Sequence, residues 1–202
     1  MAAIGRGICY LKAPLWSLFI FCLLVSSLAG AAGGPRGEAV ASAHPLATEA
    51  GLMILQAGGN AFDAAVAVSA ALAVVEPYGS GLGGGGFCML HRASDGFVTV
   101  VEARVQAPAA SRTDMYLDDK GDVNRDLAVN GPLAGGIPGE VAGLVHIAEN
   151  YGRLPLSQSL AAAIRIAREG FPVDDKFHAL MQRRVDTFRR WPAAAEALLD
   201  DG

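Results

Sequence analysis

The pattern of apolar and polar residues after position 40 predicts two helices in close succession. Thr48 is placed to cap the first, and the pair Gly58-Gly59 ends it. Asn60 is a good N-cap for the second, and Asp63 lies three residues later, near the positive end of the helix. Because Ala61 to Val75 contains almost no polar residue, we expect this second helix to be buried on all sides.

A β-hairpin is predicted next. Phe87 to Arg92 and Phe97 to Ala103 read as strands, and Asp95-Gly96 between them is a strong hairpin-turn signal. More helices are expected at Glu140 to Tyr151, at Ser157 to Arg168 and in the tail from Asp174 to Gly202, where Pro192 breaks the helix. This order predicts a layered α/β domain, although two strands are too few for a stable sheet covered by so many helices.

The first thirty residues follow the three-part plan of a secretory signal. Arg6 and Lys12 give a cationic start, Leu15 to Val25 is apolar except for one serine, and Ser26 to Ala31 supplies small residues for cleavage. We expect residues 1–31 to be a signal peptide and 32–202 to form the mature domain. An uncleaved membrane anchor is the alternative, because Ala13 to Pro35 carries no charge. In both cases the mature part is exported: periplasmic, secreted or on the extracellular membrane face.

Composition narrows the classes of function. A chain of 202 residues with 52% hydrophobic and 18% charged residues is a folded domain and not a disordered tail. A net charge of −4 gives no electrostatic footprint for nucleic acid. Cys9 and Cys22 lie in the leader, so Cys88 has no partner for an internal disulfide. It follows Phe87 in an apolar run and is interpreted as an inert core thiol.

Two motifs suggest ligands that their context excludes. The stretch Gly81 to Gly86 satisfies G-x-G-x-x-G, but a helix precedes it and a strand follows, which is the reverse of a dinucleotide-binding turn. Its glycines instead predict close backbone approach or positive φ in a tight, buried turn at the wall of a site. The acidic run Asp118 to Asp126 lacks the spacing of a calcium loop, so a solvated loop without metal is expected.

Arg104 is the one side chain whose position suggests ligand binding. It lies just past the second strand, where its planar guanidinium could hold a carboxylate in a pocket through two hydrogen bonds. A solvated surface arginine is the ordinary alternative.

Several motifs occur in an order that resembles one family. They are Gly58 to Ala67, Val75-Glu76-Pro77, Ser80 to Phe87, Arg104 before Ala107-Pro108, Pro138-Gly139-Glu140, Tyr151 to Pro155 and Ala167 to Phe171. Together they resemble the large-subunit half of the γ-glutamyltranspeptidases, also called glutathione hydrolases. The resemblance runs from about Val40 to Val173.

The resemblance implies an N-terminal nucleophile hydrolase fold, an αββα sandwich that is incomplete in this chain. A precursor of this family cuts itself into a large and a small subunit, and the new N-terminal Thr of the small subunit is the nucleophile, activated by its own amine. The enzyme transfers a γ-glutamyl group from glutathione or a similar amide to water, an amino acid or a peptide. No cofactor is implied.

Only Arg104 carries over as a substrate-binding residue, because the family's arginine at this place grips the α-carboxylate of the γ-glutamyl group. The family commonly has Arg-Glu there, whereas this chain has Arg104-Val105. The loss of the acidic neighbour leaves open related acylases on the same fold, which act on glutaryl side chains or poly-glutamate capsule.

The chain contains no residue that matches the family's nucleophile. None of Thr48, Thr99, Thr113 and Thr187 is followed by Thr or Ser and then His. We therefore expect no catalytic residue in this chain, and activity only in a longer precursor that includes the small subunit. The alternative is a complete but inactive binding module in which Arg104 still holds a glutamyl carboxylate.

Overall fold

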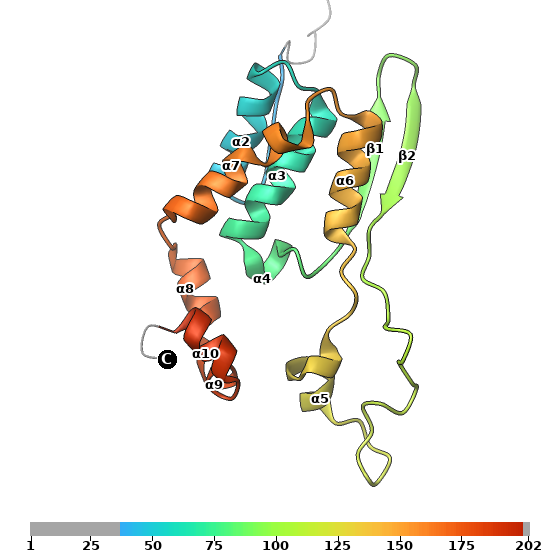
Figure 1. Cartoon of the computed structure of the whole chain (residues 1–202), viewed down its shortest axis with the longest axis vertical. Coiled ribbons are helices and arrows are strands. Elements are labelled where there is room, and N and C mark those ends of the chain that lie inside the picture. The colour runs from blue at the N-terminus through green and yellow to red at the C-terminus, as the bar shows by residue number, and fades with distance from the viewer. Residues whose placement is uncertain (1–36, 200–202) are drawn as a thin grey trace, which may run out of the picture. The chain divides into compact units, whose positions relative to one another are not determined.

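The computed structural model describes residues 37–199, and the chain divides into two compact units, Met1–Gly37 and Glu38–Gly202. The predicted signal peptide, 1–31, lies outside the described residues. Between residues 37 and 199, no helix combines the length and the apolar character needed to cross a membrane. The second unit begins with three helices, α2 (Pro45–Gln56), α3 (Ala61–Val75) and α4 (Pro77–Ser80), followed by strands β1 (Phe87–Arg92) and β2 (Phe97–Glu102) (Figure 1). Helix α5 (Arg125–Asn130) and the 3-10 turn η1 (Pro132–Ala134) come next. The rest is helical: α6 (Glu140–Tyr151), α7 (Leu156–Glu169), α8 (Asp175–Gln182), α9 (Val185–Arg189) and α10 (Pro192–Leu198).

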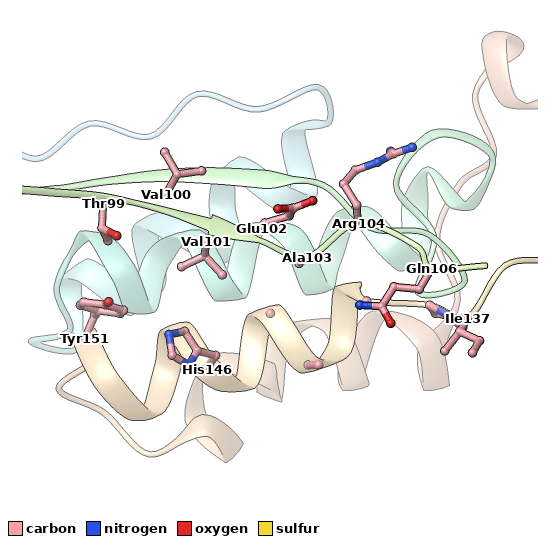
Figure 2. A pocket seen from close by; sticks show the side chains of 14 residues that line it. Thr99, Val100, Val101, Glu102, Ala103, Arg104, Gln106, Ile137, His146 and Tyr151 are labelled. Atoms are coloured by element: carbon pink, nitrogen blue, oxygen red, sulfur yellow. The ribbon is translucent and has the colours of Figure 1, made fainter. Parts of the chain in front are cut away.

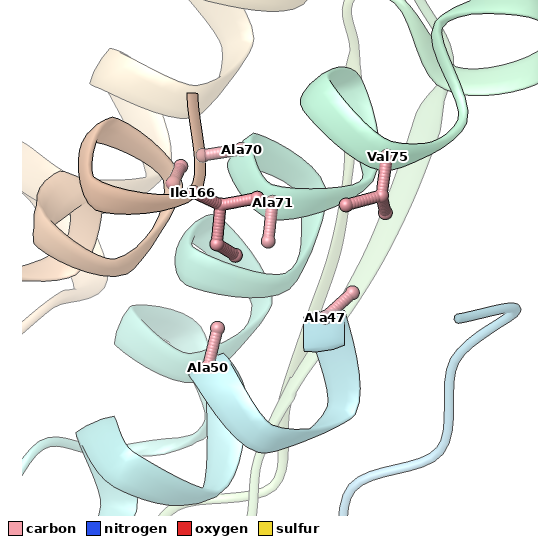
Figure 3. Close-up of a cluster of buried hydrophobic side chains, with 7 residues drawn as sticks. Ala47, Ala50, Ala70, Ala71, Val75 and Ile166 are labelled. Carbon is pink, nitrogen blue, oxygen red and sulfur yellow. The ribbon is translucent and has the colours of Figure 1, made fainter. Parts of the chain in front are cut away.

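Helix α3 lies at the centre of the core and packs against α2, α6 and α7. One cluster of buried side chains joins α2, α3 and α7, and Figure 3 shows its alanines facing one another with Val75 and Ile166 beside them. These small side chains let three helix backbones approach closely. The expectation that α3 is buried all round is only partly correct, since Ala61 and Ala65 are exposed.

The start of α2 corrects the prediction that Thr48 is its cap. The N-cap is His44, whose Nδ1 accepts the Leu46 amide, and Pro45 occupies the first helical position. Proline is favoured there because its fixed φ suits the helix and its missing N–H is not needed. Thr48 lies inside the first turn, and its hydroxyl hydrogen-bonds Ser42 Oγ at 2.8 Å.

The cap of α3 is confirmed, and it does more than the sequence indicated. Asn60 Oδ1 accepts the amides of Phe62 and Asp63, while Asp63 Oδ2 accepts the Asn60 amide. The fully buried Asp63 carboxylate also accepts the Arg153 amide at 2.9 Å and the Leu154 amide at 3.3 Å. One cap therefore ties the start of α3 to the connection between α6 and α7.

The hairpin is confirmed, with β1 and β2 antiparallel and Phe87 opposite Glu102. Its inner face packs on a second cluster from α3 and α6, through Leu90, Cys88 and Val101. Its outer face is apolar but uncovered in the described structure: Met89 is 78% exposed, and Phe87, Val98 and Val100 are more than half exposed. The sheet has two strands, so the α/β class and its incomplete sheet are as expected.

The later helices follow the prediction closely at α6 and α7, but the tail differs. It forms three short helices, interrupted at Arg183-Arg184 as well as before Pro192. Pro192 begins α10, as its missing N–H allows.

Candidate functional site

The glycine-rich segment Gly81 to Gly86 brings three chain segments into contact. Beyond the ends of β1 and β2, Gly86 and Ala103 exchange two backbone hydrogen bonds of 3.2 and 2.9 Å. The Gly84 carbonyl accepts the amides of Gly139 and Glu140, at 3.1 and 3.2 Å. The segment thereby connects the end of β2 to the start of α6.

Backbone crowding at this junction explains the glycines. A Cβ on Gly85 or on Gly139 would collide with the Ala103 carbonyl oxygen. The predicted close approach is thus confirmed, whereas positive φ is not, because none of the residues Gly81 to Gly86 has it. The prediction that the turn is buried is wrong, since Leu82 and Gly83 are exposed. Helix α4 precedes the segment and β1 follows it, so the rejection of a dinucleotide turn stands.

Arg104 follows this junction directly. Its side chain is exposed and extends from the end of β2 away from His146 and Tyr151 of α6 (Figure 2). No carboxylate of residues 37–199 lies within 4.0 Å of its guanidinium. The guanidinium group of Arg104 is therefore available to bind an external carboxylate.

Arg104 contributes to the wall of an open pocket of about 520 Å³ between β2 and α6. Thr99 and Val101 line it from the strand, and His146 and Tyr151 line it from α6 (Figure 2). Gln106 and Ile137 complete the wall and pair through hydrogen bonds of 3.0 and 2.8 Å. No local pattern predicts that pairing, because the two positions lie far apart in the chain.

Cys88 follows the glycine segment in β1, and the Glu140 amide donates to the Gly84 carbonyl. Burial raises the pKa of the Cys88 thiol, and the nearby negative charge of Glu140 raises it further. Burial also raises the pKa of Glu140 itself. A thiol with a raised pKa is protonated at neutral pH and is a poor nucleophile, as expected for a half-buried Cys88 beside the second cluster.

The acidic loop behaves as a turn. Asp118 Oδ1 accepts the amides of Lys120 and Asp122, and the Asp126 carboxylate pairs with Arg190. In the described part of the chain, no three His, Cys, Asp or Glu residues group as a metal site requires. The threonines Thr48, Thr99 and Thr187 lie in α2, β2 and α9, and Thr113 lies in a turn.

Comparison with known proteins identifies the family. The model of the family described as gamma-glutamyltranspeptidase matches residues 47–202. The chain belongs to the gamma-glutamyltranspeptidase family. The glutathione hydrolase proenzyme of Escherichia coli strain K12 is 46% identical over 136 residues, which cover 67% of this chain and 23% of that protein. The glutathione hydrolase proenzyme of Bacillus subtilis strain 168 is 42% identical over 164 residues, covering 81% and 28%.

The solved gamma-glutamyltranspeptidase of Helicobacter pylori superposes with a TM-score of 0.77 at 36% identity. The match covers 82% of this chain and 47% of that one. The architecture is therefore part of the N-terminal nucleophile hydrolase fold. This chain therefore spans about a quarter of the length of these two glutathione hydrolase proenzymes.

Proposed function

We propose that this chain is the part of a γ-glutamyl-transferring enzyme that holds the carboxylate of the donor, with Arg104 as the binding residue. The observation that carries the proposal is an exposed, unpaired guanidinium at a rigid backbone junction, in a chain of this family. The donors are γ-glutamyl amides such as glutathione, and the acceptor is water, an amino acid or a peptide.

The geometry around Arg104 supports this role. Backbone hydrogen bonds join Ala103 to Gly86 before Arg104 and Gln106 to Ile137 after it, so little backbone freedom is lost when the guanidinium engages a ligand. A guanidinium binds a carboxylate through two parallel N–H···O bonds, which orient as well as hold it. The chain contributes binding and positioning. The Thr nucleophile comes from the small subunit of the same precursor.

The small subunit is also the proposed cover for the outer face of the hairpin. Met89, Val98 and Val100 form an exposed apolar strip on a sheet with two open edges, and such surfaces mark interfaces. We propose that strands of the small subunit complete the sandwich there.

The test begins with the reading frame. Sequencing the source DNA beyond the codon for Gly202 should reveal a segment with Thr followed by Thr or Ser and then His. The complete precursor should then release p-nitroaniline from γ-glutamyl-p-nitroanilide. A confirmed stop codon after Gly202 would overturn the enzymatic proposal and leave a binding module, which should bind S-methylglutathione through Arg104 without turnover.

In the precursor, Arg104→Lys should raise KM for the donor roughly 10- to 100-fold, because the loss of one charge-assisted hydrogen bond costs about 1.5–3 kcal/mol. Arg168→Lys, an exposed change on α7, should leave KM unaltered. An unchanged KM in Arg104→Lys would remove Arg104 from the site.

Val105 stands where the family commonly has Glu, and this difference suggests glutaryl amides as a second class of donor. A glutaryl amide keeps the terminal carboxylate that Arg104 holds but lacks the α-amine that an acidic neighbour could meet. Comparing kcat/KM for γ-glutamyl and glutaryl anilides separates a transpeptidase from an acylase. A preference for the glutaryl donor would assign the chain to the acylase class.

Export is proposed on the charge and apolar pattern of residues 1–31. N-terminal sequencing of protein recovered outside the cytoplasm should begin near residue 32. A product that begins at Met1 and fractionates with membranes would indicate an anchor instead.

A further inference from the structure

A hollow of about 510 Å³ lies between α4 and the three C-terminal helices, apart from the pocket beside Arg104. Its wall is formed by apolar and aromatic side chains: Tyr78, Phe177, Leu180, Met181, Phe188 and Leu198. The rings of Tyr78 and Phe177 meet edge to face, 5.4 Å apart. Volumes of roughly 300–1,000 Å³ with mainly apolar walls are typical of sites for small ligands.

Two arginines, Arg183 and Arg184, lie at the same hollow. Together with Arg189 and Arg190 they form a basic stripe along the tail. Arg189 pairs with Asp186, and Arg190 pairs with Asp126. In contrast, no carboxylate in the described part of the chain lies within 4.0 Å of Arg183 or Arg184. Within residues 37–199, both guanidinium groups therefore lack an ion-pair partner where the apolar hollow opens.

Lys176 also lies near the hollow, but its positive charge is already paired with a carboxylate. Lys176 Nζ lies 5.4 Å from the centre of the Tyr78 ring, but it donates to the buried Glu76 carboxylate at 2.7 Å. Arg184 makes one neutral contact, donating to Asn130 Oδ1 at 2.6 Å. That contact leaves most donors of its five-donor guanidinium unused.

We propose that this hollow binds an amphipathic carboxylate, a free fatty acid of medium chain length. The apolar wall takes the acyl chain, and the forks of Arg183 and Arg184 take the carboxylate at the rim. An apolar wall beside two guanidinium groups without a carboxylate partner in residues 37–199 favours a ligand with one anionic head and one apolar tail. A polar anion would leave the wall hydrated, and an uncharged chain would leave the arginines unpaired.

The first test uses the monomeric fraction of the full chain and three ligands with the same ten-carbon tail. Isothermal titration should show saturable binding of one decanoate per chain. Decanol should bind at least 10-fold more weakly, and decyltrimethylammonium more weakly still. Equal binding of the three ligands, or no saturable binding of decanoate, would overturn the proposal without any variant.

The second test removes the charges. Arg183→Gln combined with Arg184→Gln should weaken decanoate binding at least 10-fold and leave decanol binding unchanged. The matched control is Arg165→Gln with Arg168→Gln, which removes the same charge from exposed positions on α7 and should change neither. Equal weakening by both pairs would mean a general electrostatic effect. Decanoate that binds only by dissociating a dimer would assign the hollow to a second copy of the chain.

Discussion

At the scale of single residues, buried carboxylates connect parts of the fold that are distant in sequence. Asp63 is fully buried, and its two oxygens accept backbone amides from Asn60, Arg153 and Leu154. Asp63→Asn replaces one acceptor oxygen by a donor that faces those amides. We expect a loss of about 3 kcal/mol in the free energy of unfolding, measured by urea denaturation. Asp119→Asn, in the exposed loop, should change it by less than about 0.5 kcal/mol.

Glu76 is the second such carboxylate, and its effect depends on pH. The hydrogen bond from Lys176 lowers the pKa of Glu76 below its ordinary value of 4.5, against the opposing effect of burial. A lowered pKa in the folded state stabilises the protein above about pH 4.5, and this stabilisation is lost as the pH falls through the lowered value.

Lys176→Met should therefore lower the urea midpoint at pH 7 and reduce the difference between the midpoints at pH 7 and pH 3. Lys120→Met, in the exposed loop, should alter neither. If Lys176→Met keeps the full acid sensitivity of the parent chain, other carboxylates are responsible for it.

At the scale of elements, the glycine segment decides how the hairpin joins α6. Gly85→Ala places a methyl group on the Ala103 carbonyl, so the backbone must shift, and overpacking of this kind costs about 1–3 kcal/mol. Gly83→Ala, two residues earlier, meets no atom within 4 Å and should be close to neutral. Urea unfolding of the two variants compares the same chemical change in crowded and open surroundings. Equal effects would mean that chain entropy, and not the close approach, requires the glycines.

At the scale of the whole molecule, the described unit leaves an apolar sheet face open. Met89 and Val100 lie opposite each other on that outer face. An exposed apolar strip on a two-stranded sheet predicts self-association of the isolated chain. Met89→Lys should reduce its light scattering several-fold at equal concentration. Val173→Lys, at an exposed apolar position away from the sheet, should have little effect.

The particular elements show where sequence-based prediction succeeds. The bounds of α6 and of the hairpin, and the cap at Asn60, follow from rules that act within a few residues: capping, turn chemistry and apolar spacing. The start of α2 was misplaced because the polar Thr48 competes as a cap with His44, and only the Pro45 geometry distinguishes them. The extra break in the tail at Arg183-Arg184 lacks glycine or proline and so had no local signal.

The residues of the candidate site also fall into two groups: those that local patterns predict and those that only the fold brings to the pocket. Its proposed binding residue, Arg104, is a prediction from its place at a strand end and from the family resemblance. His146, Tyr151, Gln106 and Ile137 had no such signal. Those four reach the pocket through pairing and packing between positions far apart in the chain, which no local pattern encodes.

The sequence by itself determined the family and most of the elements, and it singled out Arg104 as a candidate, because local propensity and ordered motifs are properties of neighbouring residues. Only the tertiary structure decided that the Asp63 cap also holds the α6–α7 connection and that the glycines admit the Ala103 carbonyl. It also decided that, among residues 37–199, two of the four tail arginines have no ion-pair partner beside an apolar hollow. The physical reason is that burial, close approach and charge pairing depend on which distant residues the folded backbone brings together.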